Sequence, residues 1–459
     1  MRVLLLCPAS ERIYIRDNYC CYSSKAGDLW EPVDLLYQTG FLGEAGHEVV
    51  VLDAQAERLT AAACVERVVA AAPDAILVVS GSACWDADMR QVAAIRERLP
   101  NVIAAASADI LLADARRVLR NEPALDAALL NYFSDGFVRY LAARRAGGPA
   151  TAIPNIAHRE DEDVVVGKRF GPREAHVPQP RHDLFPLNRY RLSVSGPGRF
   201  ATIIGSAGCN LACPFCVGSI QRLQCRPPAD VEREVAAVTA LGAKRLYFYD
   251  PNFTSSPERV RAVCEAVRRA APRARWLANA HVSCLDEDTV RLMAECGCHT
   301  LMLGLESAND RTLALYRKGF TSSEAEQAVA RCRAAGIRVL GYFLIGVPEE
   351  SEDDILRTID FARRLGLAYA SFNLPAPAPG TPMHVRHGHP GAPTAGVDHS
   401  VRSSIPHPTI PPDRLAALRR RAMRRFYLRP GLLARRALEA LLPWRTAAVI
   451  RAGVSLLRR

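Results

Sequence analysis

The chain has 459 residues, 49% of them hydrophobic, which is enough apolar material for two sizeable cores, so we expect two or three domains. No apolar run reaches the ~20 residues of a membrane span, and Met1 leads directly into a strand-like segment without a signal-peptide pattern. These features predict a cytoplasmic protein. Its fourteen cysteines then favour reduced thiols and metal ligation over a disulfide framework.

The formal net charge of +11 is concentrated at the C-terminus. From Arg414 onward there are thirteen Arg and one Glu, a net of +12, which leaves the preceding residues at −1. A neutral body with a basic tail does not have the charge pattern of a nucleic-acid-binding protein. We therefore predict no nucleic-acid partner.

Residues 1–145 alternate short apolar runs with amphipathic stretches. This alternation predicts a doubly wound parallel sheet, whose ligand site lies at the carboxyl ends of the strands. Polar residues at those ends include Ser80, Ser82 and Ser107. The expected strands are 3–7, 48–52, 75–80 and 102–107, and the expected helices are 33–46, 61–72 and 86–99. Residues 146–198 are rich in charge, Pro and Gly, and are predicted to be a linker.

Residues 199–385 form a second α/β run. Six βα units predict a partial α/β barrel, with its chemistry where strands end and loops begin. The expected strands are 201–205, 245–250, 276–282, 300–306, 338–345 and 369–374. The remaining residues, 386–459, are predicted to be a basic helical region.

Three cysteines, Cys209, Cys213 and Cys216, follow directly after the first barrel strand. Three thiolates in one loop at this spacing can face a single 4Fe-4S cubane and leave one iron without a protein ligand. That iron can bind the amino and carboxylate groups of S-adenosylmethionine (SAM). A cluster reduced by an external one-electron donor can then cleave a C–S bond of SAM homolytically. The alternative is a zinc loop completed by a distant His, but zinc loops usually carry two paired spacings and no second pair follows here.

The loop 209–216, with Phe215 before the last cysteine, resembles the signature of the radical SAM superfamily. Residues 180–385 carry further motifs of that superfamily in the same order, including 346–350 and 377–382. The resemblance implies that Asp250 positions the SAM amino group and that Lys318 lies near the SAM carboxylate. It also implies that the segment with Gly304, Glu306 and Ser307 holds the ribose.

Strand geometry agrees with two of these assignments. Side chains alternate along a strand, so Gly304 and Glu306 share a face, and the glycine leaves room beside a carboxylate that can accept two ribose hydroxyl bonds. Asn279 and His281 share a face of the third strand in the same way, and we predict that they are catalytic residues that meet the substrate. The alternative for His281 is a satisfied core histidine.

The domain order, joined through residues 179–186, resembles the radical SAM subgroup with an N-terminal cobalamin-binding domain. That subgroup includes carbon and phosphorus methyltransferases and the anaerobic cyclase of chlorophyll synthesis. The resemblance implies a cobalamin cofactor, with Ser80, Ser82 and Ser107 near its nucleotide tail. This chain departs from the subgroup because no His precedes His47 to ligate cobalt, and because Ala105 and Ala106 stand where many members have Gly-Gly. A degenerate, structural domain is the alternative.

We therefore expect a cobalamin-dependent radical SAM methyltransferase that acts on an unactivated carbon. Its substrate would be a small molecule, free or carrier-bound, such as a lipid precursor or a specialised metabolite of antibiotic biosynthesis. One alternative is a radical SAM cyclase, isomerase or oxidase without methyl transfer. Another is a non-catalytic cobalamin or SAM sensor that binds nucleic acid through its tail, although a sensor has no need of an open iron.

Two segments leave more than one interpretation open. Leu415, Leu418, Met423 and Phe426 recur at helical spacing and favour a helix packed on the barrel. Farther along, Leu and Trp interleave with Arg over residues 432–457, a pattern typical of an interfacial helix on an anionic membrane or of a dock for an acidic carrier. The aromatic-rich loop 14–30 fits either a cover over the active site or a surface loop.

Overall fold

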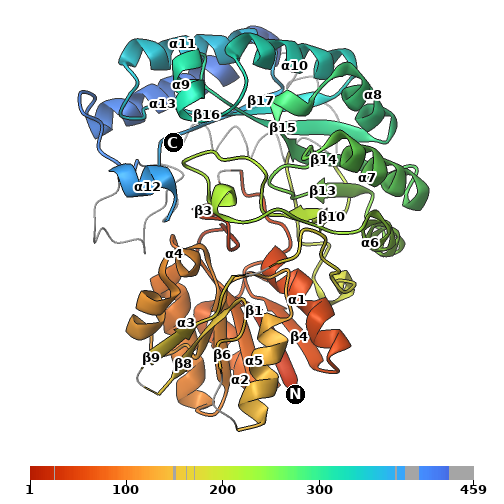
Figure 1. Ribbon diagram of the computed structural model, residues 1–459, viewed down its shortest axis with the longest axis vertical. Helices are drawn as coiled ribbons and strands as arrows, with labels where there is room; N and C mark the ends of the chain where they lie inside the picture. Colours follow the sequence, from red (N-terminus) through yellow and green to blue (C-terminus); the bar gives the residue numbers. More distant parts are fainter. Residues whose placement is uncertain are drawn as a thin grey trace.

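The computed structural model describes residues 1–459 apart from Lys25 and residues 148–150, 162, 170, 378–379, 388–402 and 434–459. Two α/β units lie against each other along the long axis of the molecule (Figure 1). The N-terminal unit contains a seven-stranded sheet and the second unit a six-stranded sheet. The predicted fold class is confirmed.

The first sheet has the order β4-β1-β5-β6-β7-β8-β9. Its parallel part contains β1 (Arg2–Cys7), β4 (Glu48–Asp53), β5 (Ala75–Val79), β6 (Ile103–Ser107) and β7 (Ala127–Leu129). The helices of this unit are α1 (Val33–Glu44), α2 (Ala61–Ala71), α3 (Trp85–Arg98), α4 (Asp109–Asn121) and α5 (Gly136–Arg145). Strand β1 is apolar and buried from Val3 to Cys7, because a strand covered on both faces needs no polar side.

The first sheet extends beyond the predicted boundary at residue 145. Strands β8 (Ile156–Glu160) and β9 (Asp163–Val166) add to it antiparallel to β7 and to each other. The interpretation of 146–198 as a linker is wrong for these residues. Val164 is fully buried while its neighbours are not, which is the alternating burial of a half-buried edge strand. The strand has only four residues, so this alternation is too short to predict a strand from the sequence.

The second sheet runs in chain order and is parallel throughout. Its strands are β10 (Phe200–Ile203), β13 (Arg245–Phe248), β14 (Arg275–Ala280), β15 (Cys298–Glu306), β16 (Arg338–Leu344) and β17 (Tyr369–Asn373). Between them lie α6 (Pro228–Ala240), α7 (Pro257–Ala270), α8 (Glu287–Glu295), α10 (Ser322–Ala334) and α11 (Glu352–Arg364). Six strands in sequential order form the partial barrel that the sequence predicts.

Alternation along the barrel strands divides their side chains between two cores. On β14, Trp276 and Ala278 pack against the outer helices, whereas Leu277 belongs to the core of the N-terminal unit. Met302 on β15 and Tyr247 on β13 face the N-terminal unit in the same way. The inner face of the barrel and the first domain therefore share one continuous core.

The loop 14–30 lies at this shared core. It contains a hairpin of β2 (Tyr14–Arg16) and β3 (Cys21–Ser23). The ring of Trp30 lies 5.6 Å from those of Tyr247 and Tyr249 in the barrel. The structure thus decides between the two interpretations of this loop, because it covers the inside of the barrel.

The C-terminal helix α13 (Pro412–Tyr427) packs along α11 and β17 (Figure 1). Leu415, Leu418 and Phe426 are buried in the outer core of the barrel and Met423 packs against it. The packed helix predicted from the apolar spacing is confirmed for this segment. The stretch proposed as an interfacial helix lies mostly outside the described residues. Within the described part of the chain, every helix is too short or too polar to cross a membrane.

Candidate active site

The three predicted cluster ligands lie together in the loop after β10. The backbone N–H of Cys216 donates to the carbonyl of Cys213, and the N–H of Leu211 donates to Cys209 Sγ at 3.4 Å. Burial raises the pKa of all three thiols, to about 11 for Cys216, whereas the charge of Lys318 lowers it. A Cβ at position 218 would lie 3.3 Å from Cys209 Cβ and 3.5 Å from Cys216 Sγ, so Gly218 avoids a crowded contact with these two cysteines. A half-buried pocket of three thiols next to a cation fits an anionic iron–sulfur cluster.

In the described residues, no three Cys, His, Asp or Glu side chains converge on a single metal ion. A cubane does not need such convergence, because each of its thiolate ligands binds a different iron atom. The loop therefore fits a 4Fe-4S cluster bound by Cys209, Cys213 and Cys216.

A buried ion pair extends from the cluster loop to β15. Lys318 Nζ lies 4.0 Å from Cys213 Sγ and 3.2 Å from Glu306 Oε1. Burial alone would lower the pKa of Lys318, but Glu306 and then Cys213 raise it, so the lysine stays charged. Glu306 is held in the left-handed region, with φ of 59°, at a register shift against β16. Such strain costs about 1–3 kcal/mol and is concentrated at functional sites.

Gly304 makes room for this pair, as the sequence predicted. A Cβ at position 304 would lie 2.6 Å from Glu306 Oε1 and 3.0 Å from Lys318 Nζ. The three residues therefore form one unit beside the cluster. A charged pair of this kind can bind the hydroxyls and the carboxylate of SAM, since one member accepts and the other donates hydrogen bonds.

Asp250 has protein partners of its own. Its Oδ1 accepts from the backbone N–H of Gly205 at 2.7 Å and its Oδ2 from Ser206 Oγ at 2.6 Å. Asp250 is 1% exposed. It therefore fixes the start of the cluster loop, and its predicted contact with the SAM amino group stays a prediction.

The two candidate catalytic residues on β14 differ in their surroundings. Asn279 donates to the carbonyl of Asp250 at 2.9 Å and so links β14 to β13. His281 is 5% exposed; its Nδ1 pairs with Ser283 Oγ, and its Nε2 is buried without a partner among the described residues. Burial, with help from the charge of Lys318, lowers the pKa of His281 to about 4. His281 is thus a neutral imidazole beside the Lys318 unit, with one nitrogen available to a ligand.

Two further predicted residues, Phe215 and Ser307, contact the protein around the site. Phe215 packs edge-on against Tyr316, with ring centroids 5.2 Å apart. Ser307 Oγ donates to Glu350 at 3.3 Å, and Glu350 in turn accepts from the backbone N–H of Gly346. Ser307 is fully buried, so the structure shows it holding the 346–350 turn.

The three serines predicted to meet the cobalamin tail donate instead to carboxylates of their own domain. Ser80 donates to Asp88 at 2.7 Å, Ser82 to Asp109 at 2.8 Å and Ser107 to Asp34 at 2.5 Å. All three serines are buried. In addition, Cys21 of the hairpin lies close to Gly81, since a Cβ added to Gly81 would be 2.3 Å from the Cβ of Cys21. The protein's own side chains therefore fill the space at the carboxyl ends of β5 and β6.

Loop 14–30 reaches the cluster loop through contacts that the sequence did not reveal. The backbone N–H of Gly208 donates to Tyr19 Oη at 2.6 Å, and Tyr249 Oη donates to Asp17 at 2.6 Å. Cys20 Sγ lies 4.0 Å from Tyr249 Oη. Only the aromatic content of the loop hinted at these contacts, because they join residues about 190 and 230 positions apart.

A partial α/β barrel that presents three thiols and a buried Glu–Lys pair at the carboxyl ends of its strands defines an iron–sulfur enzyme that uses SAM. Residues 203–362 match the family model described as the radical SAM superfamily. The match covers most of the barrel, so this part of the chain is similar to radical SAM domains, as the resemblance implied.

Similar proteins are found over most of the chain. An uncharacterized methyltransferase of Pyrococcus horikoshii, PH0819, is 26% identical over 94% of each chain. The anaerobic magnesium-protoporphyrin IX monomethyl ester cyclase of Synechocystis sp. is 26% identical over 72% of this chain and 67% of its own. The solved structure of the radical SAM methyltransferase TsrM of Kitasatospora setae, with cobalamin and a [4Fe-4S] cluster bound, superposes with a TM-score of 0.66. It is 20% identical to this chain and the match covers 84% of this chain and 77% of TsrM, so the likeness shows the shared fold.

Proposed function

We propose that this protein is a cobalamin-dependent radical SAM methyltransferase that methylates an unactivated carbon of a small molecule, such as a specialised metabolite or lipid precursor. The observation that carries the proposal is the unit of Gly304, Glu306 and Lys318 beside the cluster cysteines, on a barrel whose inner face is covered by a cobalamin-type domain. The methyltransferase of Pyrococcus horikoshii, which matches nearly end to end, supports the choice of reaction.

The fit to cobalamin depends on loop 14–30 rather than on the three serines. Asn18 is 1% exposed, and its Oδ1 has no partner among the described residues. It lies between Asp17 and Tyr19, which both contact the barrel. A buried carbonyl oxygen without a donor costs about 1–3 kcal/mol. The amide side chains of a corrin offer such donors, so we expect Asn18 to contact cobalamin.

When bound, the cluster and cobalamin supply the electron that cleaves SAM and the methyl group that is transferred. The protein's own residues bind SAM and orient it relative to the cluster loop. Glu306 and Lys318 hold SAM against the cluster loop, and Asp250 holds that loop through Gly205 and Ser206. Neutral His281 can donate one hydrogen bond from Nε2 to SAM or substrate without adding charge.

The proposal is tested by anaerobic reconstitution with iron and sulfide, with and without cobalamin, followed by analysis of SAM products. Methyl transfer predicts S-adenosylhomocysteine only when cobalamin is present, and S-adenosylhomocysteine together with 5′-deoxyadenosine during turnover. If cobalamin is not retained and 5′-deoxyadenosine is the sole SAM-derived product, the proposal is wrong.

That outcome would favour a radical SAM cyclase, isomerase or oxidase with a structural N-terminal domain. The observation that favours this alternative is the filled space at the carboxyl ends of β5 and β6, where Cys21 packs against Gly81 and the three serines donate to carboxylates.

A further inference from the structure

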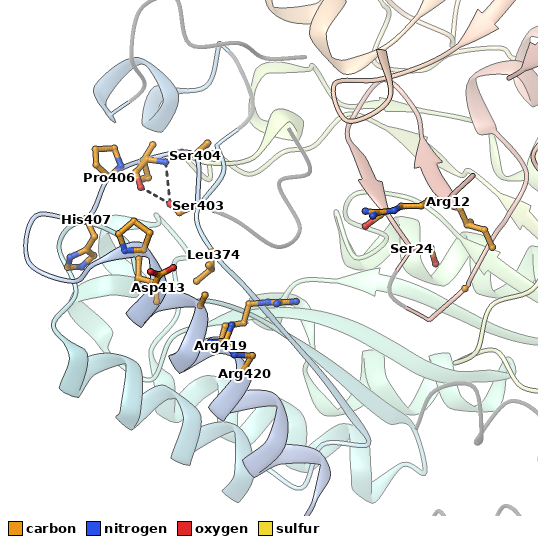
Figure 2. Close-up of a pocket in the computed structure, with 17 residues that line it drawn as sticks. Arg12, Ser24, Leu374, Ser403, Ser404, Pro406, His407, Asp413, Arg419 and Arg420 are labelled. Atoms are coloured by element: carbon orange, nitrogen blue, oxygen red, sulfur yellow. Dashed lines mark hydrogen bonds between the residues drawn. The ribbon is translucent and has the colours of Figure 1, made fainter. Parts of the chain in front are cut away.

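A cavity of about 1090 Å³ opens between the N-terminal loop and the C-terminal helix of the barrel (Figure 2). One wall is formed by residues 12–13, 23–24 and 27 of the loop beside the hairpin. The opposite wall is formed by Leu374 after β17, residues 403–407 and the first half of α13. A volume of this size suits a complete small molecule. No residue predicted from the sequence as catalytic or cofactor-binding lines it.

The charges that line the cavity are mainly positive. Arg12, Arg419 and Arg420 line it, against the single carboxylate of Asp413. The ring of His407 is held in place, because its Nδ1 accepts from the backbone N–H groups of Thr409 and Ile410 while its Nε2 faces the carbonyl of Glu350. The Arg and Asp side chains of the lining together carry a net charge of about +2, which favours an anionic ligand.

Helix α13 separates its arginines into two groups. Arg414 pairs with Glu352 and Arg425 with Asp360, both on α11. Arg420 lies on the cavity side and pairs with no carboxylate among the described residues, and the same holds for Arg12 across the cavity. Figure 2 shows Arg12 reaching from the loop into the space between the two walls. Each wall therefore presents an exposed guanidinium group that can bind an anion.

The apolar part of the lining leads toward the cluster. Ile405 lines the cavity and also belongs to a small core with Leu344, Val347 and Tyr316. Phe215 of the cluster loop packs against that core. Leu374 and Leu415 extend the apolar surface on the same side. A ligand held by its anionic group at the arginines would lay an apolar body along the wall that adjoins the cluster loop.

We infer that this cavity is the substrate site, and that the substrate is an amphiphile with a phosphate or carboxylate group bound by Arg12 and Arg420. This inference rests on the proposed function only in assigning the bound molecule as the methyl acceptor. The anion-binding step itself needs neither the cluster nor SAM.

Calorimetric titration of the full chain with hexyl phosphate, hexanoate and hexylammonium tests the inference. The two anions should bind and the cation should not, and the tighter anion identifies the head group. Arg12→Gln and Arg420→Gln should each weaken anion binding about tenfold or more, because each removes charged hydrogen bonds. The control is Arg421→Gln, an adjacent exposed arginine of α13 that does not line the cavity, and it should leave binding unchanged.

The inference is overturned if neither anion binds, if hexylammonium binds equally well, or if both glutamine variants bind the anions like the wild type. Circular dichroism separates these results from misfolding, and exposed substitutions of this kind usually change stability by less than about 0.5 kcal/mol. Arginine-dependent anion binding by a protein that makes no S-adenosylhomocysteine would support the site and refute only the methyl transfer.

Discussion

Replacing Glu306 by Gln tests the unit that joins the cluster loop to β15. Glu306 is 7% exposed, and its Oε1 lies 3.2 Å from Lys318 Nζ. The amide keeps the shape of the side chain but loses the charge that accepts ribose hydroxyl bonds. Loss of a charged hydrogen-bonding partner costs about 1.5–3 kcal/mol, so the dissociation constant for SAM should rise roughly 10- to 150-fold. The iron content should not change, because the proposed bonds of Glu306 do not reach metal.

The assay is anaerobic equilibrium binding of SAM to the reconstituted protein, with iron and sulfide measured on the same samples. Lys318 loses its buried partner in this variant, so thermal unfolding is followed as well. Glu326→Gln is the matched control, since Glu326 lies exposed on α10 away from the site. A SAM dissociation constant equal to that of the wild type in a folded, cluster-loaded variant would refute the role of Glu306.

Three further predictions concern the cluster, the domain interface and the tail. Cys213→Ala should yield a soluble protein that lacks the cluster and reductive SAM cleavage, and 5′-deoxyadenosine formation by this variant would contradict the ligand assignment. Burial would lower the pKa of His182, but Glu31 and Glu234, at 2.5 and 2.9 Å, raise it to about 10. The stability from charged His182 is complete below pH 6.5 and is lost as the pH rises toward 10. In urea denaturation, His182→Leu should lower the free energy of unfolding by about 3–5 kcal/mol at pH 7 and should abolish the decrease in stability that the wild type shows between pH 8 and 10. An unchanged pH profile would show that the interface does not depend on this charge. We propose that the basic tail attaches to anionic membranes. A chain ending at Leu433 should then stay folded and lose its salt-sensitive binding to anionic vesicles. If the intact chain does not bind such vesicles at low salt, this proposal is wrong.

The elements of both sheets could be predicted from local patterns. The predicted strands are mainly apolar and the helices between them are amphipathic, so each predicted strand has an observed counterpart within a few residues of it, whereas the short β7 was not predicted. Strands β8 and β9 were missed because they are short, lie in a segment rich in Gly and Pro, and are defined by pairing with β7 rather than by their own sequence.

The chemistry of the site could be predicted from residues that lie close together in the chain. The spacing of Cys209, Cys213 and Cys216 follows from neighbours along the chain, and strand alternation correctly predicted that Gly304 leaves room beside Glu306. The left-handed φ of Glu306 and the register shift at β16 were not predicted, because they depend on the neighbouring strand. Only the packed fold shows which of these groups have other partners: the three serines donate to buried carboxylates, and Asp250 accepts from Ser206 at the start of the cluster loop. It also placed Arg12 and Arg420 on two walls of one cavity. Contacts between residues hundreds of positions apart depend on how the two domains pack, and no local pattern in the sequence records that packing.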